Sequence, residues 1–131
     1  MQISRAADRS HQSANSDWFT GEVTMAPLAR PDGPSLVAAL EVTFAPGART
    51  NWHTHPVGQT LIVTQGKGWA AREGEARIDI GPGDVVRFAP GERHWHGATT
   101  DSQMTHIAIQ EAQNGSTTAW AEPVSDTDYA G

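Results

Sequence analysis

The stretch GARTNWHTHPVGQTLIVTQG, residues 47–66, places two histidines one residue apart, then a Pro-Val-Gly turn, then a glutamine that opens a β-branched segment. In an extended strand, residues i and i+2 point to the same face, with Cα atoms roughly 6–7 Å apart. The imidazoles of His53 and His55 can therefore converge on one cation. Gln59 shares the parity of Leu61, which predicts that its amide also points inward.

The rest of the chain is rich in short strand patterns and poor in helix signals. Residues 36–44, LVAALEVTF, place apolar side chains on one face with period two, as in a half-buried strand. Further strands are predicted at 60–65, 69–72, 76–80, 85–88 and 103–111, with glycine- and proline-rich turns between them. Short strands at this spacing, without a helix long enough for a crossover, indicate an antiparallel sandwich or barrel. One helical turn is predicted after Ser125.

The length of 131 residues suits one domain. We expect an N-terminal arm at 1–16, a β domain at 17–112 and a C-terminal tail at 113–131 that packs on the barrel. The chain has no cysteine, so any metal must be held by nitrogen or oxygen atoms.

The charge pattern limits the classes of partner that the protein is expected to bind. The net charge is −6, and the nine lysines and arginines are scattered, which argues against nucleic acid. No run approaches the roughly 18 apolar residues of a membrane span, and the polar N-terminus lacks the apolar core of a signal peptide. We therefore expect a cytoplasmic protein whose partner is a small molecule or a second copy of the chain.

Five of the six histidines fall in predicted strands or at their edges, and His11 is interpreted as a surface residue. One His-x-His pair alone is equally consistent with a metal site and with two buried hydrogen-bonding groups. The second pair, His94 and His96, makes a metal site the better interpretation. The imidazoles of His53, His55 and His94, together with the amide oxygen of Gln59, suit manganese, iron, nickel or zinc. Spacing alone leaves Gln59 open between a ligand and a polar residue that starts a strand.

The spacing of Gly47, His53, His55, Gln59 and Gly66 resembles the first cupin motif, G-x5-H-x-H-x3-E-x6-G, with glutamine in place of glutamate.

The segment from Gly83 to His94, with Pro90 and Gly91, resembles the second cupin motif, although the proline lies one position late and Ala98 stands where asparagine is expected. The resemblance implies an all-β, single-domain cupin jelly-roll β-barrel of antiparallel strands. It also implies one metal held by His53, His55, Gln59 and His94.

Longer stretches are similar to the bacterial cupin hydroxynitrile lyases, which use manganese: WFTG at 18–21, PGDVVRFAPGERHWHG at 82–97 and MTHIAIQE at 104–111. This resemblance implies a lyase that cleaves and forms cyanohydrins, with an aldehyde or ketone plus cyanide as the other side of the reaction. Mn²⁺ is the expected metal, and Fe²⁺, Ni²⁺ or Zn²⁺ also fit the ligand types. We expect a homodimer or homotetramer, because cupins often pair through sheet edges.

The predicted substrate pocket follows from strand parity, except in the strand at 103–111. There, hydrophobicity favours Ile107 and Ile109 as the inward residues, whereas the resemblance favours the face that carries His106. The predicted pocket comprises Leu40, Val42, Phe44, Leu61 and Ala108. Taken singly, Leu40, Val42 and Ala108 are better explained as plain core.

Three neutral histidines and a neutral glutamine leave the +2 charge of a divalent ion uncompensated, whereas glutamate would reduce it to +1. Such a site favours an anionic ligand, as cyanohydrin cleavage requires. The resemblance implies that His106 is the base, and that His96, Gln110 and Thr50 bind the hydroxyl or the nitrile. Two alternatives stay open: an Fe(II)-dependent cupin dioxygenase, and a small-ligand-binding cupin without lyase activity.

Overall fold

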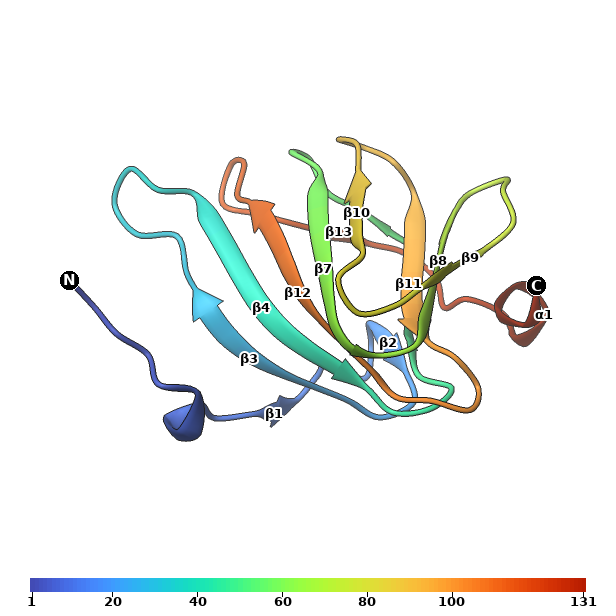
Figure 1. Cartoon of the computed structure of the whole chain (residues 1–131). Coiled ribbons are helices and arrows are strands. Elements are labelled where there is room, and N and C mark those ends of the chain that lie inside the picture. The colour runs from blue at the N-terminus through green and yellow to red at the C-terminus, as the bar shows by residue number, and fades with distance from the viewer.

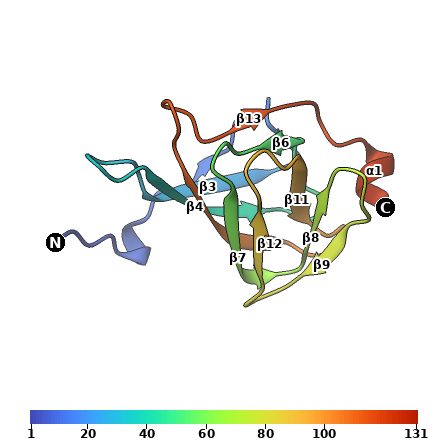
Figure 2. The same cartoon turned by 90° about the horizontal axis from the view of Figure 1, so that it is seen from above.

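The computed structural model describes residues 1–131, and its regular structure is almost entirely β-strand. Two antiparallel sheets face each other and enclose the core (Figures 1 and 2). The N-terminus and the C-terminus lie on opposite sides of this barrel (Figure 1). No helix in the structure is long and apolar enough to cross a membrane. Because every strand pairing is antiparallel and the helical segments are short, the predicted all-β domain of antiparallel strands is confirmed.

The first sheet contains the longest strands. Its order is β1 (Gln12–Ser13), β3 (Val23–Ala29), β4 (Val37–Phe44), β12 (Met104–Glu111), β7 (Gln59–Gly66) and β10 (Val85–Phe88). Strands far apart in sequence are neighbours here, so β12 lies between β4 and β7 and brings its side chains beside both.

The second sheet is built from shorter strands. Its order is β13 (Ala119–Trp120), β6 (His53–Thr54), β11 (His94–Ala98), β5 (Arg49–Thr50) and β2 (Phe19–Thr20), and β8 (Gly68–Arg72) pairs with both β11 and β9 (Ile78–Ile80). The pairing of β6 with β11 places His53 directly opposite His94. The helical segments are η1 (Ala6–Asp8) and α1 (Asp126–Ala130).

Strand β3 is one element to which the sequence analysis assigned no strand. Its sequence VTMAPLA contains Pro27, which cannot donate to a sheet ladder. The structure accommodates Pro27 at a register shift between Pro27 and Ala29, where the neighbouring β1 no longer pairs. Proline in a strand is tolerated at such bulges and edges.

The core lies between the two sheets, and Phe44, Leu61 and Met104 are completely buried in it. Strand β12 buries His106, Ala108 and Gln110 on its inner face, while its isoleucines are only partly covered. The choice of the His106 face is thus confirmed against the hydrophobicity pattern.

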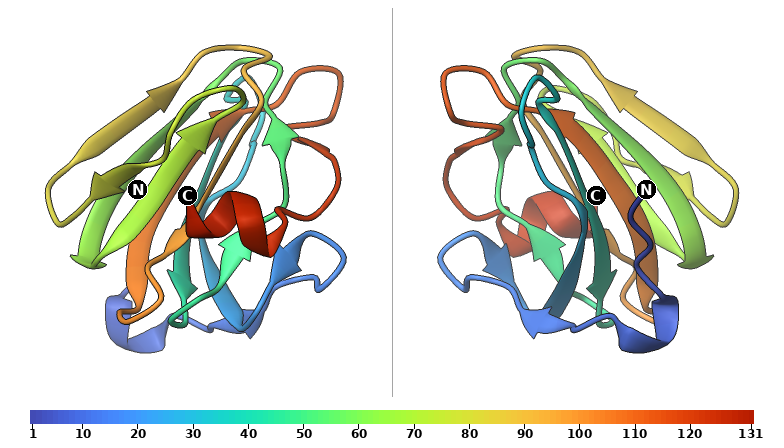
Figure 3. Two further views of the ribbon diagram at one scale, coloured as in Figure 1. Left: turned by 90° about the vertical axis from the view of Figure 1, so that its right-hand side faces the viewer. Right: turned by 90° about the vertical axis from the view of Figure 1, so that its left-hand side faces the viewer.

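The C-terminal tail covers the outer face of the second sheet, where α1 lies against the barrel (Figure 3). Tyr129 and Val124 pack with Trp95 and Ala71 in a second apolar cluster. The Tyr129 hydroxyl donates to the Ala98 carbonyl at 2.6 Å, and the Arg49 guanidinium lies 4.4 Å from the Tyr129 ring.

Replacing Tyr129 with alanine is expected to lower the free energy of unfolding by about 3 kcal/mol, the usual cost of removing a buried aromatic ring. Chemical denaturation at neutral pH measures this loss. The exposed neighbour Thr127 provides the control, since Thr127→Ala removes no packed side chain. Equal stability of the Tyr129→Ala and Thr127→Ala variants would show that the tail does not stabilise the barrel.

Candidate metal centre

Five buried histidines meet inside one end of the barrel. His53 and His55 come from β6 and the turn after it, and His94 lies across from His53 on β11. The ring centroids of His53 and His94 are 4.2 Å apart, and those of His53 and His55 are 5.0 Å apart. The period-two geometry predicted for the His-x-His pair is therefore present.

Each of these three histidines is held by a backbone carbonyl. The Nδ1 atoms of His53, His55 and His94 lie 2.8 Å from the carbonyl oxygens of Asn51, Thr117 and Glu92 respectively. A carbonyl oxygen only accepts hydrogen bonds, so each Nδ1 carries the proton and each Nε2 presents a lone pair. A metal-binding histidine is typically fixed in this way. The Nε2 of His55 is buried and has no partner.

Gln59 reaches the same place through a tight turn. The Gly58 N–H donates to the His55 carbonyl at 3.2 Å, and Gly58 has a φ of 83°, which favours glycine. Gln59 then opens β7 with its side chain inside the barrel.

The Gln59 amide faces His94 in an arrangement that suits a cation. Gln59 Oε1 lies 3.1 Å from His94 Nε2, and both atoms are acceptors. Two acceptors at this distance repel unless a positive group lies beside them. Two ligands of one divalent cation, each roughly 2.0–2.2 Å from it, are themselves about 3 Å apart. The donor atoms therefore fit a metal ion.

His96 belongs to the same cluster by distance but differs in its contacts. The ligand nitrogens of His53, His94 and His96 all lie within 4.8 Å of one another, a group that does not include His55. However, Nδ1 of His96 faces Nε2 of His106 at 3.1 Å rather than a backbone carbonyl. The carbonyl-anchored pattern thus separates His53, His55 and His94 from the His96–His106 pair.

Burial keeps the cluster neutral. Desolvation lowers the pKa of His94 to about 3 and that of His106 to about 4. It also lowers the pKa of His53, His55 and His96. All five imidazoles therefore present lone pairs at neutral pH, which is the form that binds a metal or accepts a proton.

The metal-free protein is expected to lose stability in mild acid. The same histidines titrate near 6.5 in the unfolded chain, so that state takes up protons first as the pH falls. Stability is fully present above pH 6.5 and is lost as the pH falls toward the lower folded-state pKa values. Each histidine contributes a slope of up to about 1.4 kcal/mol per pH unit. Denaturation midpoints that stay unchanged from pH 7 to pH 4.5 would contradict this.

An internal cavity of about 80 Å³ adjoins the cluster, several times the roughly 10–15 Å³ that one water needs. Its walls include most of the predicted pocket and catalytic residues: Leu40, Val42, Phe44, Thr50, His96, His106, Ala108 and Gln110. Leu61 does not line this cavity and lies in the core instead. Of the four predicted metal ligands, His53, His55 and Gln59 border the cavity, and His94 does not.

Sequence reasoning missed part of the cavity wall. Phe19, Met25, Thr117, Thr118 and Trp120 also line it. Three of these come from the segment after residue 112, which reads as a polar tail. Trp120 packs against His53 with ring centroids 4.7 Å apart, and this contact depends on the pairing of β13 with β6. The available signal was Trp120 itself, a large aromatic residue in a mostly polar segment.

A wider space of about 710 Å³ lies beside this cavity. Six residues line both spaces: Phe19, Met25, Leu40, Thr117, Thr118 and Trp120. At the rim, the rings of Trp18 and Trp120 stack with centroids 5.3 Å apart. The wall that the two spaces share is therefore largely apolar, with two aromatic rings in it.

The cavity wall holds polar groups with hydrogen-bonding capacity to spare. Thr50 Oγ1 accepts the backbone N–H of His96 at 3.2 Å, which leaves the threonine proton free to donate. Nε2 of His96 and Nδ1 of His106 are buried and have no partner. These groups can serve a bound molecule without breaking an existing hydrogen bond.

Comparisons of the sequence and of the structure with known proteins agree with one another. Residues 40–109 match the cupin domain family. The chain is 55% identical over 129 residues to a protein of Granulicella tundricola named (R)-mandelonitrile lyase, and the match covers 98% of each chain. A crystal structure of a cupin-like protein from Thermotoga maritima superposes with a TM-score of 0.88 at 37% identity, covering 96% of this chain and 95% of that one.

A more distant structure shows how far the fold extends. The polyketide cyclase RemF from Streptomyces resistomycificus has a TM-score of 0.79 at 17% identity, and the match covers 98% of this chain and 90% of that one. At this identity the similarity concerns the fold alone.

Proposed function

The chain belongs to the cupin family, and from that premise we propose that it is a metal-dependent hydroxynitrile lyase. It cleaves cyanohydrins to an aldehyde or ketone plus cyanide, and it catalyses the reverse addition. The observation that carries the proposal is a buried cluster of neutral histidines beside a neutral amide, open to a small cavity. The relative named as a mandelonitrile lyase supports the choice of substrate class.

We assign His53, His55, Gln59 and His94 as the metal ligands. The carbonyl contacts of the three histidines and the pairing of two acceptors at Gln59 and His94 support this set. We propose Mn²⁺ as the metal on the strength of the resemblance to manganese cupins, and Fe²⁺, Ni²⁺ and Zn²⁺ accept the same ligand types. When bound, the divalent ion supplies a Lewis acid that lowers the pKa of the substrate hydroxyl.

The histidine pair beyond the metal ligands is suited to take the proton. His106 is neutral at pH 7 because burial lowers its pKa to about 4. In our proposal the hydroxyl proton passes to Nδ1 of His106, the ring nitrogen that has no partner. Nε2 of His106 then donates to Nδ1 of His96, 3.1 Å away, and this hydrogen bond stabilises the added positive charge.

The rest of the reaction follows from that transfer. As the proton leaves, the oxygen electrons form the carbonyl bond, and the carbon–carbon bond breaks with its electron pair on cyanide. The pair of histidines then returns the proton, so that the products are the carbonyl compound and hydrogen cyanide. Thr50 donates to the substrate oxygen, and the apolar wall of Val42, Phe44 and Ala108 holds the organic part away from water.

Incubation of the metal-loaded protein with mandelonitrile tests the proposal. Benzaldehyde and cyanide should appear in equal amounts, faster than in a protein-free blank and faster than with chelator-treated protein. Product formation at the blank rate would contradict the proposal. Oxygen uptake measured in the same vessel would instead indicate dioxygenase chemistry.

Replacing Gln59 with glutamate is expected to strengthen metal binding and to slow cleavage by about tenfold, near 1.4 kcal/mol of transition-state stabilisation. The carboxylate is a better ligand but reduces the net charge of the site from +2 to +1, which weakens its effect on the substrate hydroxyl. Metal affinity and kcat measured on one preparation separate the two effects. An unchanged kcat would show that the neutral amide has no role in the chemistry.

For the assembly we propose a homodimer or homotetramer. Val37 and Val85 are exposed in β4 and β10 of the first sheet, and a second copy would cover such apolar side chains. Sedimentation of the purified protein determines the number of copies.

A further inference from the structure

We propose that Gln110 is a positioning residue that fixes the orientation of the Gln59 amide. The proposal rests on the ligand set above, in which Gln59 binds the metal through its oxygen. It gives Gln110 a role different from the substrate-binding role expected from the sequence, because both ends of its amide are already engaged.

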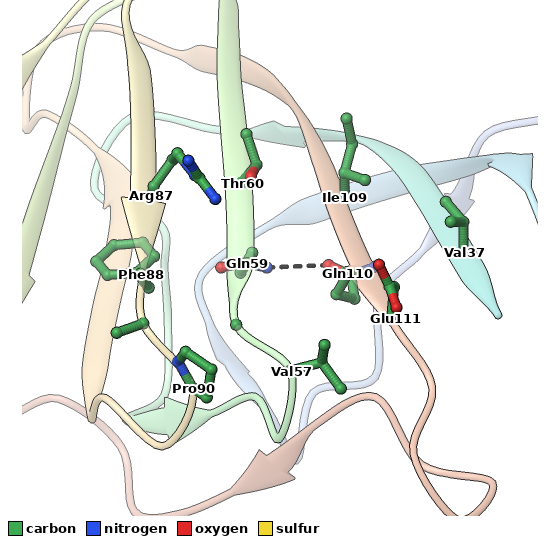
Figure 4. Close-up of a pocket in the computed structure, with 12 residues that line it drawn as sticks. Val37, Val57, Gln59, Thr60, Arg87, Phe88, Pro90, Ile109, Gln110 and Glu111 are labelled. Atoms are coloured by element: carbon green, nitrogen blue, oxygen red, sulfur yellow. Dashed lines mark hydrogen bonds between the residues drawn. The ribbon is translucent and has the colours of Figure 1, made fainter.

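Ala38, Gln110 and Gln59 form one row across three strands. Gln110 on β12 is the register partner of Ala38 on β4 and of Gln59 on β7. Gln59 and Gln110 are buried residues, 7% and 6% exposed, so water does not compete freely for their amides. Figure 4 shows the two amides joined between β7 and β12.

The row begins at an atom with only one possible role. The Ala38 carbonyl oxygen can only accept a hydrogen bond. The Gln110 atom that faces it at 3.3 Å must therefore be the amide nitrogen Nε2. Oε1 of Gln110 then faces Gln59, which must donate its own Nε2 at 3.1 Å. Consequently Oε1 of Gln59 is the atom turned toward His94.

This chain of contacts opposes a competing orientation. Without a metal, Gln59 would gain a hydrogen bond by turning its Nε2 toward the lone pair of His94 Nε2. That rotation would place an N–H group where the metal ligand oxygen belongs. It would also bring Gln59 Oε1 against Gln110 Oε1, two acceptors in a buried place, so Gln110 disfavours it.

The same reasoning pairs the residue at 59 with the residue at 110. A glutamate at position 59 presents oxygen at both ends and needs no orienting partner. It would also face the Gln110 oxygen with a carboxylate, and Gln110 could then pair with it only by giving up its contact with the Ala38 carbonyl. The two glutamines therefore form a matched pair that keeps a neutral ligand correctly turned.

A double-mutant cycle tests this inference through metal binding, with no substrate present. We would compare wild-type protein, Gln110→Met, Gln59→Glu and the double variant, and measure the affinity for Mn²⁺ from the signal of the free ion. Methionine keeps the length of the side chain and removes the acceptor. Loss of a group that orients a metal ligand typically weakens metal binding 10–100-fold, and we expect about tenfold for Gln110→Met.

In the Gln59→Glu background, Gln110→Met should weaken Mn²⁺ binding by less than about threefold, because a carboxylate has no wrong orientation. An equal loss in both backgrounds, or no loss in either, would overturn the inference. Glu111→Gln, an exposed neighbour on β12, is the matched control and should bind as wild type does. Because the measurement needs no turnover, its result is independent of whether the protein is a lyase.

Nuclear magnetic resonance of the unsubstituted, metal-free protein gives a second test, which holds even where Gln110→Met fails to fold. The Gln59 side-chain N–H protons should show through-space contacts to Gln110. Contacts of those protons with the His94 ring instead would overturn the inference.

Discussion

Replacing His94 with alanine should weaken metal binding more than about 100-fold, since loss of a group that only orients a ligand already costs 10–100-fold. The substitution removes an Nε2 lone pair that faces Gln59 Oε1 at 3.1 Å. Cyanohydrin cleavage should fall to the rate of chelator-treated wild-type protein. Elemental analysis of the purified variant and its rate with mandelonitrile measure the two effects.

The control for this variant is a histidine outside the barrel. His11 is exposed, and its Nε2 contacts Glu41 at 2.9 Å rather than any residue of the cluster. The His11→Ala variant should keep both its metal and its activity. If His94→Ala retained one metal per chain and normal turnover, the proposed ligand set would be wrong.

Replacing His106 with alanine should separate chemistry from metal binding. A positioned acid or base contributes about 10²–10⁴-fold to a rate, so we expect kcat to fall at least about 100-fold. The metal content should stay at the wild-type level, because His106 contacts His96 and none of the proposed ligands through a hydrogen bond. Steady-state kinetics and elemental analysis on the same sample check both statements.

Wild-type turnover by a metal-loaded His106→Ala variant would exclude His106 as the base. Loss of the metal from that variant would show that His106 supports the site rather than the proton transfer. The His11→Ala protein again serves as the reference for the loss of one imidazole.

The arrangement of His53, His55 and Gln59, three of the four proposed metal ligands, could be predicted from the sequence because it is local. His53 and His55 share a face through the two-residue period of a strand, and the turn at Gly58 returns the chain at Gln59. His94 was predicted from the second motif, and its position opposite His53 follows from the pairing of β6 with β11. The short spacing between glycine-rich turns was likewise enough to predict an antiparallel barrel.

The features that sequence reasoning could not supply depend on register between distant strands. The contact of Gln110 with Gln59 and Ala38 exists because β12 lies between β7 and β4 in one particular register. The Thr117 carbonyl that holds His55 comes from a loop 62 residues away. Neither contact has a local pattern that a single sequence displays.

The inner face of β12 shows where hydrophobicity misleads. Its isoleucines are more apolar than His106 and Gln110, yet the polar residues are the buried ones. Burial of these polar side chains is sustained by partners on other strands, as the His96–His106 and Gln59–Gln110 contacts show. Along the wall of this cavity the usual preference for apolar residues inside is thus reversed.

The central claim is that one metal ion, held by three histidines and a glutamine, enables cyanohydrin cleavage without oxygen. Titration of Mn²⁺ into metal-free protein in oxygen-free buffer, with mandelonitrile cleavage followed at each addition, tests it most directly. The rate should rise in proportion to added metal and level off at one ion per chain. Full activity in the metal-free protein, or activity that appears only when oxygen is admitted, would contradict the claim.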